Sequence, residues 1–226
     1  MTKRIAKQLD SFRYKGESVK ITLGTLTLVA LSVFIIIIST FTQISFVHYI
    51  LPNELFLHFG HDLNTDEFRN NIVFNYEYIP QVPIIFFLAG FLGRTFGILA
   101  VMIYIALGLF CYPVFALGGG VKYILEYGFG YILAYIPAIF FAGSIVKSKY
   151  TLLNILKGVF IGVLLIHFIG VLYVLLVAII KQETSSMITG WLSAQSGVKM
   201  LYDMFFSVVA MYVAKYLKKV LWITMC

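Results

Sequence analysis

The chain has 226 residues, of which 61% are hydrophobic and only 12% are charged, and its mean hydropathy is +0.93. A soluble domain is about half apolar and roughly a quarter charged, so this composition excludes an ordinary soluble protein and predicts an integral membrane protein. The net charge of +7 does not indicate nucleic-acid binding, because the basic residues collect at the ends of apolar runs.

Residues 1–20 form a basic segment that we expect to lie in the cytoplasm. The uncharged run that follows, residues 21–46, is far longer than the hydrophobic region of a cleavable signal peptide. It is also long enough to cross a bilayer, which takes about 20 residues. We therefore predict that this run is an uncleaved first transmembrane helix.

Five more apolar runs follow, and we expect residues 21–222 to form one transmembrane domain. The runs cover residues 79–93, 95–121, 127–146, 158–180 and 200–214. Six helices is the simplest count, although the short second and sixth runs leave five or seven as alternatives. The predicted fold is an all-α integral membrane protein with six transmembrane helices.

The lysines and arginines predict the orientation of these helices. With six spans, thirteen of the 17 basic residues fall on the side of the two termini and four fall on the opposite side. Basic loops are retained in the cytoplasm, so we predict that both termini are cytoplasmic. An odd number of spans would break this alternation.

The first outer loop, residues 47–78, is unusually long and is acidic. Loops of this length are often lids or binding elements. Its acids are Glu54, Asp62, Asp66, Glu67 and Glu77. The pair His58 and His61, followed by Asp62, has metal-like spacing, but no further ligand is evident in the sequence. We therefore expect a solvated loop and no metal site.

Asp203 and His167 are polar residues within or beside apolar runs. An acid at such a position is costly and usually faces a cavity or a partner. The alternative for Asp203 is an interfacial charge near a helix N-terminus, favoured by the helix dipole and paired with Lys199. His167 is expected either to line a cavity or to bond a neighbouring backbone carbonyl.

A glycine triplet, Gly118, Gly119 and Gly120, interrupts the stretch YPVFALGGGVKYILEYGFGYI at residues 112–132. Glycine loses more backbone freedom on ordering than any other residue, so a compensating contact is expected. Two explanations stand: a ligand that the backbone approaches closely, or a tight turn between helices. Lys122 is correspondingly either a cation for an anionic ligand group or a solvated loop lysine.

Several kinds of site are missing from the sequence. It contains no G-x-x-x-x-G-K-[ST] phosphate loop, no H-E-x-x-H and no G-x-S-x-G. The two cysteines, Cys111 and Cys226, imply no disulfide framework. An enzyme with Asp203 and His167 as acid and base would lack a nucleophile or metal set, so we expect neither an enzyme nor a cofactor.

The stretch FLAGFLGRTFGILAVMIYIALGLFCYPVFALGGGVKYILEYGFGYILAYIPAIFFAG, residues 87–143, closely resembles the BioY family. These proteins are the biotin-binding membrane subunits, or S components, of energy-coupling factor transporters. The resemblance continues more loosely through HFIGVLYVLL, residues 167–176, to the C-terminal helix.

The resemblance implies six transmembrane helices with cytoplasmic ends and a biotin site that opens outward between the later helices. It also implies partners: a transmembrane coupling subunit and a pair of ATP-binding cassette ATPases, which alone use ATP. The expected location is the inner membrane of a prokaryote. The rival within transport is an S component for another small vitamin.

The chemistry of biotin then suggests roles for particular residues. Asp203 would accept hydrogen bonds from the ureido N–H groups, Gln81 or a tyrosine hydroxyl would donate to the ureido oxygen, and Lys122 with the glycine triplet would hold the carboxylate. The residues expected to bind biotin are Gln81, Gly118, Gly119, Gly120, Lys122, Tyr123, Tyr131, His167, Lys199 and Asp203. Family members often carry a lysine three residues after the acid, where this chain has Phe206; Lys199 is the candidate replacement.

Overall fold

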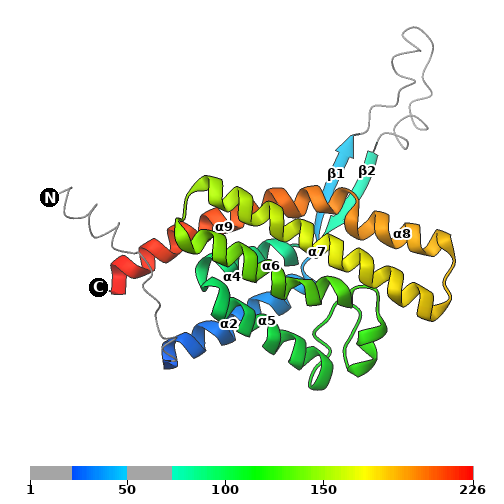
Figure 1. Cartoon of the computed structure of the whole chain (residues 1–226), viewed down its shortest axis with the longest axis horizontal. Coiled ribbons are helices and arrows are strands. Elements are labelled where there is room, and N and C mark those ends of the chain that lie inside the picture. The colour runs from blue at the N-terminus through cyan, green and yellow to red at the C-terminus, as the bar shows by residue number, and fades with distance from the viewer. Residues whose placement is uncertain (1–21, 50–72, 226) are drawn as a thin grey trace, which may run out of the picture.

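The computed structural model describes residues 22–49 and 73–225, and most of them lie in long helices that pack together (Figure 1). In chain order the elements are α2 (Leu23–Phe41), β1 (Ile44–Tyr49), β2 (Val73–Tyr78), α4 (Gln81–Phe91), α5 (Gly93–Phe110), the 3₁₀ helix η2 (Val121–Leu125), α6 (Phe129–Ser148), α7 (Leu152–Lys181), α8 (Ser185–Ser196) and α9 (Val198–Met225). The predicted basic segment at residues 1–20 lies outside the described residues.

Five helical stretches within the described residues are long and apolar enough to cross a membrane. They are α2, α5, α6, α7 and the stretch Ser185–Val220, which joins α8 to α9. The second predicted run is the apolar helix α4, whose 11 residues reach only about 16 Å and cannot cross a bilayer alone. The prediction of a helical membrane fold is confirmed, with α4 as the short sixth helix.

Several helix ends differ from the predicted runs, for local reasons. The third run was expected to reach residue 121, but α5 ends at Phe110, shortly before Pro113, which cannot continue a helix. The fifth run was expected to begin at residue 158, but α7 begins at Leu152. The side chain of Thr151 caps it by accepting a hydrogen bond from the backbone of Asn154 at 3.3 Å.

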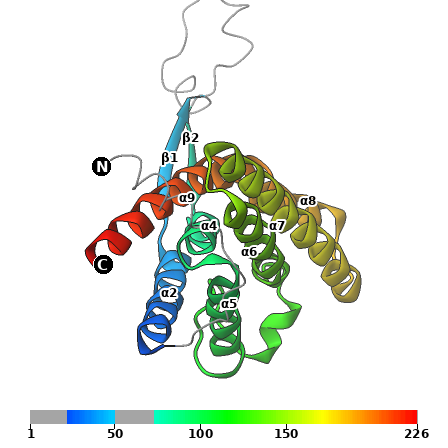
Figure 2. The ribbon, with the colours of Figure 1, turned by 60° about the vertical axis from the view of Figure 1, so that its left-hand side comes forward.

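The described ends of the predicted outer loop form a β-hairpin, which the all-α prediction did not include. Strands β1 and β2 pair antiparallel, with Ile44 opposite Tyr78 and Tyr49 opposite Val73. They project beyond the helices (Figure 2). The residues between the strands, including His58 and His61, lie outside the described residues. The hairpin matters for function because its last residue, Tyr78, is completely buried among the helices.

Helix α4 lies at the centre of the bundle. It packs against α2, α5, α6 and α9 (Figure 2). The side chains of Val82, Ile85, Phe86 and Leu88 are at most 2% exposed. These residues point in several directions around α4, so the other helices shield it and it does not need to match the thickness of the bilayer.

Glycines on one helix accommodate aromatic rings of the next. The Tyr131 ring on α6 lies against Gly170 on α7, and the Tyr173 ring on α7 lies against Gly130 on α6. A methyl group added at either glycine would overlap the facing ring. Each helix thus supplies one glycine notch and one ring, so α6 and α7 fit together in one register.

Candidate ligand-binding site

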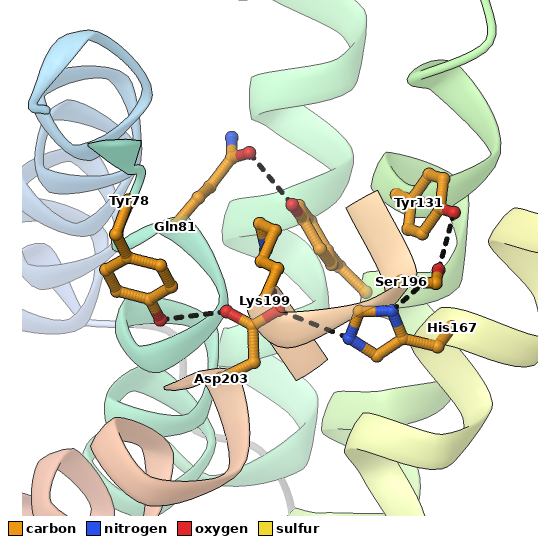
Figure 3. A network of polar contacts seen from close by, with 8 residues as sticks. Tyr78, Gln81, Tyr131, His167, Ser196, Lys199 and Asp203 are labelled. Carbon is orange, nitrogen blue, oxygen red and sulfur yellow. Dashed lines mark hydrogen bonds and ion pairs between the residues drawn. The ribbon is translucent and has the colours of Figure 1, made fainter. Parts of the chain in front are cut away.

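Asp203 on α9 is completely buried, and hydrogen-bond donors from three elements converge on its carboxylate. The Tyr78 hydroxyl at the end of β2 donates to Oδ1 at 2.8 Å. On Oδ2, Lys199 Nζ lies at 2.6 Å and His167 Nε2, from α7, at 3.2 Å. Figure 3 shows Tyr78 and His167 on opposite sides of the carboxylate. These contacts compensate for burying a charge that is otherwise expensive.

Lys199 lies one helical turn before Asp203, and its side chain is only 15% exposed. Its ammonium group also lies 5.7 Å from the centre of the Tyr78 ring, within the range of a cation–π contact. The pair of Lys199 with Asp203 that the sequence suggested is present. The carboxylate itself, however, has no contact with solvent, so it is not a solvated interfacial charge.

Tyr78 keeps its proton in this arrangement. Burial, followed by the nearby charge of Asp203 and the hydrogen bond to it, raises the pKa of the Tyr78 hydroxyl well above its ordinary value. The hydroxyl therefore remains a donor to the carboxylate across the physiological pH range. It connects the hairpin directly to the buried acid.

The hydrogen bonds continue beyond His167 to α8 and α6. His167 Nδ1 lies 3.0 Å from the Ser196 hydroxyl, which lies 2.7 Å from the Tyr131 hydroxyl. The Tyr131 ring also meets the His167 ring edge-on, with 5.9 Å between the centroids. We call the connected set of residues the Asp203 network (Figure 3); its members are Tyr78, Tyr131, His167, Ser196, Lys199 and Asp203.

Gln81, at the start of α4, forms a second polar cluster beside this network (Figure 3). Its amide nitrogen donates to Thr40 Oγ1 at 2.8 Å and to the Tyr104 hydroxyl at 3.0 Å. Its amide oxygen accepts a hydrogen bond from the Tyr135 hydroxyl at 2.8 Å. Both amide hydrogens of Gln81 thus have partners within the protein, and the cluster ties α2, α4, α5 and α6 together.

The tight turn in which it lies accounts for the presence of the glycine triplet. Gly118 and Gly120 have φ angles of 115° and 87°, which side-chain-bearing residues rarely adopt. A Cβ at Gly119 would lie only 2.7 Å from the Gly108 carbonyl oxygen and from Pro113 Cα. Gly120 also donates a backbone hydrogen bond to Gly108 at 2.8 Å. These observations favour the tight-turn explanation of the two that the sequence left open.

The structure does not join the loop residues to the Asp203 network. Lys122 is exposed, whereas Tyr123 is buried with its ring 4.5 Å from that of Phe115. Across residues 22–49 and 73–225, no hydrogen bond or ion pair links Lys122, Tyr123 or the triplet to the network. Their predicted contact with a ligand therefore remains a prediction, whereas Tyr131, His167, Lys199 and Asp203 do come together.

Sequence reasoning missed three residues at the site. Tyr78 was assigned to the outer loop, and Ser196 to the connection before the last helix. Ser207 lies one helical turn after Asp203, is completely buried, and its hydroxyl has no partner among the described residues. For Ser207 a signal existed, because it is a polar residue four positions from the acid and so on the same helix face.

Fold and site together define a class of protein. Apolar helices surround a buried, ionisable network, and such groups inside a membrane protein usually mark a pathway or site for a substrate. Residues 77–222 match the BioY family, which is more than half of the chain. The chain therefore belongs to the BioY family and is a multi-pass membrane protein.

Individual relatives agree with this assignment. The chain is 34% identical over 108 residues to a probable biotin transporter BioY of Lysinibacillus sphaericus; the match covers 42% of this chain and 53% of the relative, so it spans about half of that protein. The crystal structure of the S-component for biotin from an ECF-type ABC transporter shares the fold. Its TM-score is 0.58 at 21% identity, with 88% of this chain and 95% of that chain covered.

Proposed function

We propose that this protein is the biotin-binding S component of an energy-coupling factor transporter. The observation that carries the proposal is the completely buried carboxylate of Asp203, on which donors from β2, α7 and α9 converge. Membership of the BioY family supports it. The function is therefore binding and transport rather than catalysis.

The chemistry of biotin suits this carboxylate. The ureido group presents two N–H donors, and a carboxylate accepts two hydrogen bonds through its two oxygens. In the bound state these N–H groups would replace some of the donors that Asp203 now receives from the protein. Lys199, the nearest cation, would then be available to the carboxylate of biotin or to its ureido oxygen.

The ureido oxygen needs hydrogen-bond donors, and Ser207 offers one. Its buried hydroxyl lacks a partner among the described residues and lies one turn from Asp203 on α9. Gln81, the donor suggested from the sequence, already directs both amide hydrogens to Thr40 and Tyr104. We therefore place Ser207 before Gln81 as the donor to the ureido oxygen.

Transport itself would require partners. We propose that a transmembrane coupling subunit and a pair of ATP-binding cassette ATPases energise the protein in the inner membrane of a prokaryote. Lys122 and the glycine triplet remain candidates for the carboxylate of biotin, reached from the outer side. The sequence has no phosphate-binding loop of its own, which fits ATP hydrolysis by separate subunits.

Calorimetry of the protein purified in detergent tests the proposal. We expect saturable heats with biotin and with desthiobiotin, which keeps the ureido group and the carboxylate. Thiamine and riboflavin should give none. Binding of thiamine or riboflavin in place of biotin would identify an S component for another vitamin, and the absence of binding to all four would refute the proposal.

A further inference from the structure

Helix α8 lies beside the network and is held weakly. None of its 12 residues is buried, and among the described helices it packs mainly against α7 and α9. An element with so little buried apolar surface opens more easily than the core. Its position therefore depends on a few specific contacts.

The first set of contacts holds the corner between α7 and α8. The Tyr127 hydroxyl, just before α6, donates to Glu183 Oε1 at 2.7 Å. The centre of the Tyr127 ring lies 5.4 Å from that of Trp191 on α8. Lys181 Nζ lies 4.7 Å from the centre of the Tyr127 ring. These contacts hold the α7–α8 corner and the middle of α8 against the segment just before the beginning of α6.

The second contact holds the end of α8. Ser196 is the last residue of the helix, and its hydroxyl bridges Tyr131 and His167 at 2.7 and 3.0 Å. Gly197 follows, and a Cβ there would overlap the Ser193 carbonyl oxygen. Only glycine therefore permits this abrupt connection from α8 into α9. The hydrogen bonds of the Ser196 hydroxyl hold this end of α8 in place.

The direction of these hydrogen bonds follows from the chemistry of the groups. A carboxylate only accepts, so His167 Nε2 must carry the hydrogen that faces Asp203. In a neutral imidazole Nδ1 is then an acceptor, and the Ser196 hydroxyl donates to it. The Ser196 oxygen in turn accepts from Tyr131.

We propose that Ser196 is a positioning residue of the ligand site. Its hydroxyl holds the His167 ring in the tautomer that serves Asp203, and it fastens α8 over that part of the site. Loss of the hydroxyl frees both the ring and the end of the helix, so a bound ligand escapes faster. The inference rests on the proposed function and adds the element that retains biotin.

Dissociation of radiolabelled biotin after a chase with unlabelled biotin tests this role. Ser196→Thr keeps the hydroxyl. Ser196→Val introduces a side chain of the same shape as threonine but without the hydroxyl. Two hydrogen bonds of about 1 kcal/mol each correspond to a release that is roughly 10-fold faster or more in Ser196→Val. Ser193→Ala is the matched control on α8, because among the described residues the Ser193 hydroxyl bonds only to the Thr189 carbonyl of its own helix.

A second measurement reports on α8 directly. The chain has two tryptophans, Trp191 and Trp222, so in a Trp222→Phe background the selectively excited tryptophan fluorescence comes from α8 alone. We expect biotin to change the Trp191 emission in the parent and in Ser196→Thr, and to change it much less in Ser196→Val.

The outcomes separate this inference from the proposed function. Equal release rates and equal Trp191 responses in Ser196→Thr and Ser196→Val would overturn the positioning role while leaving biotin binding intact. A parent protein that binds no biotin would instead refute the proposed function. Without ligand, Ser196→Val should melt at a somewhat lower temperature than Ser196→Thr, because it lacks two hydrogen bonds that the ligand-free structure contains. Release rates are therefore compared at a temperature at which both variants are fully folded.

Discussion

At the level of single residues, the site depends on a carboxylate kept away from solvent. Asp203 has Lys199 as its counter-ion, and Tyr78 and His167 donate two further hydrogen bonds to its carboxylate. Removing one member of a buried ionic set is usually more harmful than its net contribution suggests, because the other charge remains buried and unpaired. Variants here must therefore be judged on ligand affinity and ligand-free stability together.

Asp203→Asn is expected to weaken biotin binding. The amide replaces a charged acceptor with a neutral one and introduces N–H groups where the ureido N–H groups would lie. Hydrogen bonds to charged groups contribute about 1.5–3 kcal/mol, so the Kd measured by calorimetry should rise roughly 10-fold or more. Glu126→Gln, a change to an acid paired with Lys181 outside the network, serves as control. Unchanged affinity in Asp203→Asn would place the ligand elsewhere.

Ser207→Ala should have opposite effects on stability and affinity. A buried donor without a partner costs about 1–3 kcal/mol, so its removal should raise the ligand-free Tm by a few degrees. Loss of a donor to the ureido oxygen should raise the Kd for biotin roughly 2- to 10-fold. Differential scanning fluorimetry and calorimetry measure the two quantities. If both stability and affinity rise or stay constant, Ser207 does not contact the ligand.

Gly119→Ala tests the tight-turn explanation of the triplet. The new methyl would press on the backbone of Gly108 and Pro113, so we expect a lower Tm without ligand and near-normal affinity in the protein that remains folded. Gly24→Ala on α2, where the nearest atom is 3.8 Å away, is the control. The reverse pattern, with normal stability and lost binding, would show that this loop contacts the ligand.

The sequence indicated part of the site, because polar residues are rare in apolar runs. Asp203 and His167 were visible for that reason, and the structure brings them to within 3.2 Å. Tyr78 and Ser196 were not visible, since tyrosine and serine are ordinary residues at the edges of transmembrane helices. Their roles depend on how the hairpin and α8 fold back onto the bundle, which spacing along the chain does not reveal.

At the level of elements, hydropathy along the sequence located the long apolar helices. It missed α8 and the two strands, which are not long apolar runs. Helices α6 and α7 follow from apolar runs because lipid demands such surfaces. Helix α8 is polar enough to look like a connection, and β1 continues the first apolar run with β-branched and aromatic residues that suit either structure. Length alone could not show that this run changes from helix to strand after Phe41.

The hairpin is attached to α9 by an aromatic cluster. The Tyr202 ring stacks on Phe46 of β1 at 5.0 Å and on Tyr76 of β2 at 5.4 Å. Phe206, where a lysine was expected from the family pattern, stacks on Phe46 at 5.8 Å and packs against Tyr78 at 5.4 Å. The aromatic side chain at position 206 thus packs against aromatic residues of the hairpin.

Tyr202→Ala should loosen the hairpin selectively. Aromatic pairs contribute about 0.5–1.5 kcal/mol each beyond the area that they bury, and this change removes the stacks with both strands. Hydrogen exchange measured by mass spectrometry should become faster in residues 44–49 and 73–78 and stay unchanged in α6 and α7. Tyr212→Ala, which removes a ring paired with Tyr216 further along α9, should leave the strands protected. Equal protection in both variants would contradict the attachment.

At the level of the whole molecule, the length of α7 sets the two sides of the membrane. Its 30 residues extend about 45 Å, more than the roughly 30 Å of the hydrocarbon core, so its two ends lie in opposite aqueous compartments. Lys147 in the last turn of α6 and Lys149 in the turn that follows precede α7, and the turn after α7 leads to α8. The basic residues place the first turn in the cytoplasm, which remains a prediction.

Thiol labelling in intact cells checks this orientation. In a background without Cys111 and Cys226, Thr184→Cys should react with a membrane-impermeant reagent added outside. Lys149→Cys should react only after the cells are lysed, and that reaction shows that the site is accessible in principle. Labelling of Lys149→Cys but not Thr184→Cys in intact cells would invert the topology.

The rings that occupy glycine notches between α6 and α7 also constrain how the protein can change over generations. Tyr131 needs Gly170 and Tyr173 needs Gly130, since neither ring leaves room for a methyl group. A lineage that replaces one of these glycines must therefore shrink the facing ring, in the same step or beforehand. Among relatives we expect positions 131 and 170, and likewise positions 130 and 173, to covary as pairs. The Tyr131 hydroxyl also hydrogen-bonds to Ser196. A substitution at Gly170 that displaces the Tyr131 ring would therefore alter the ligand site.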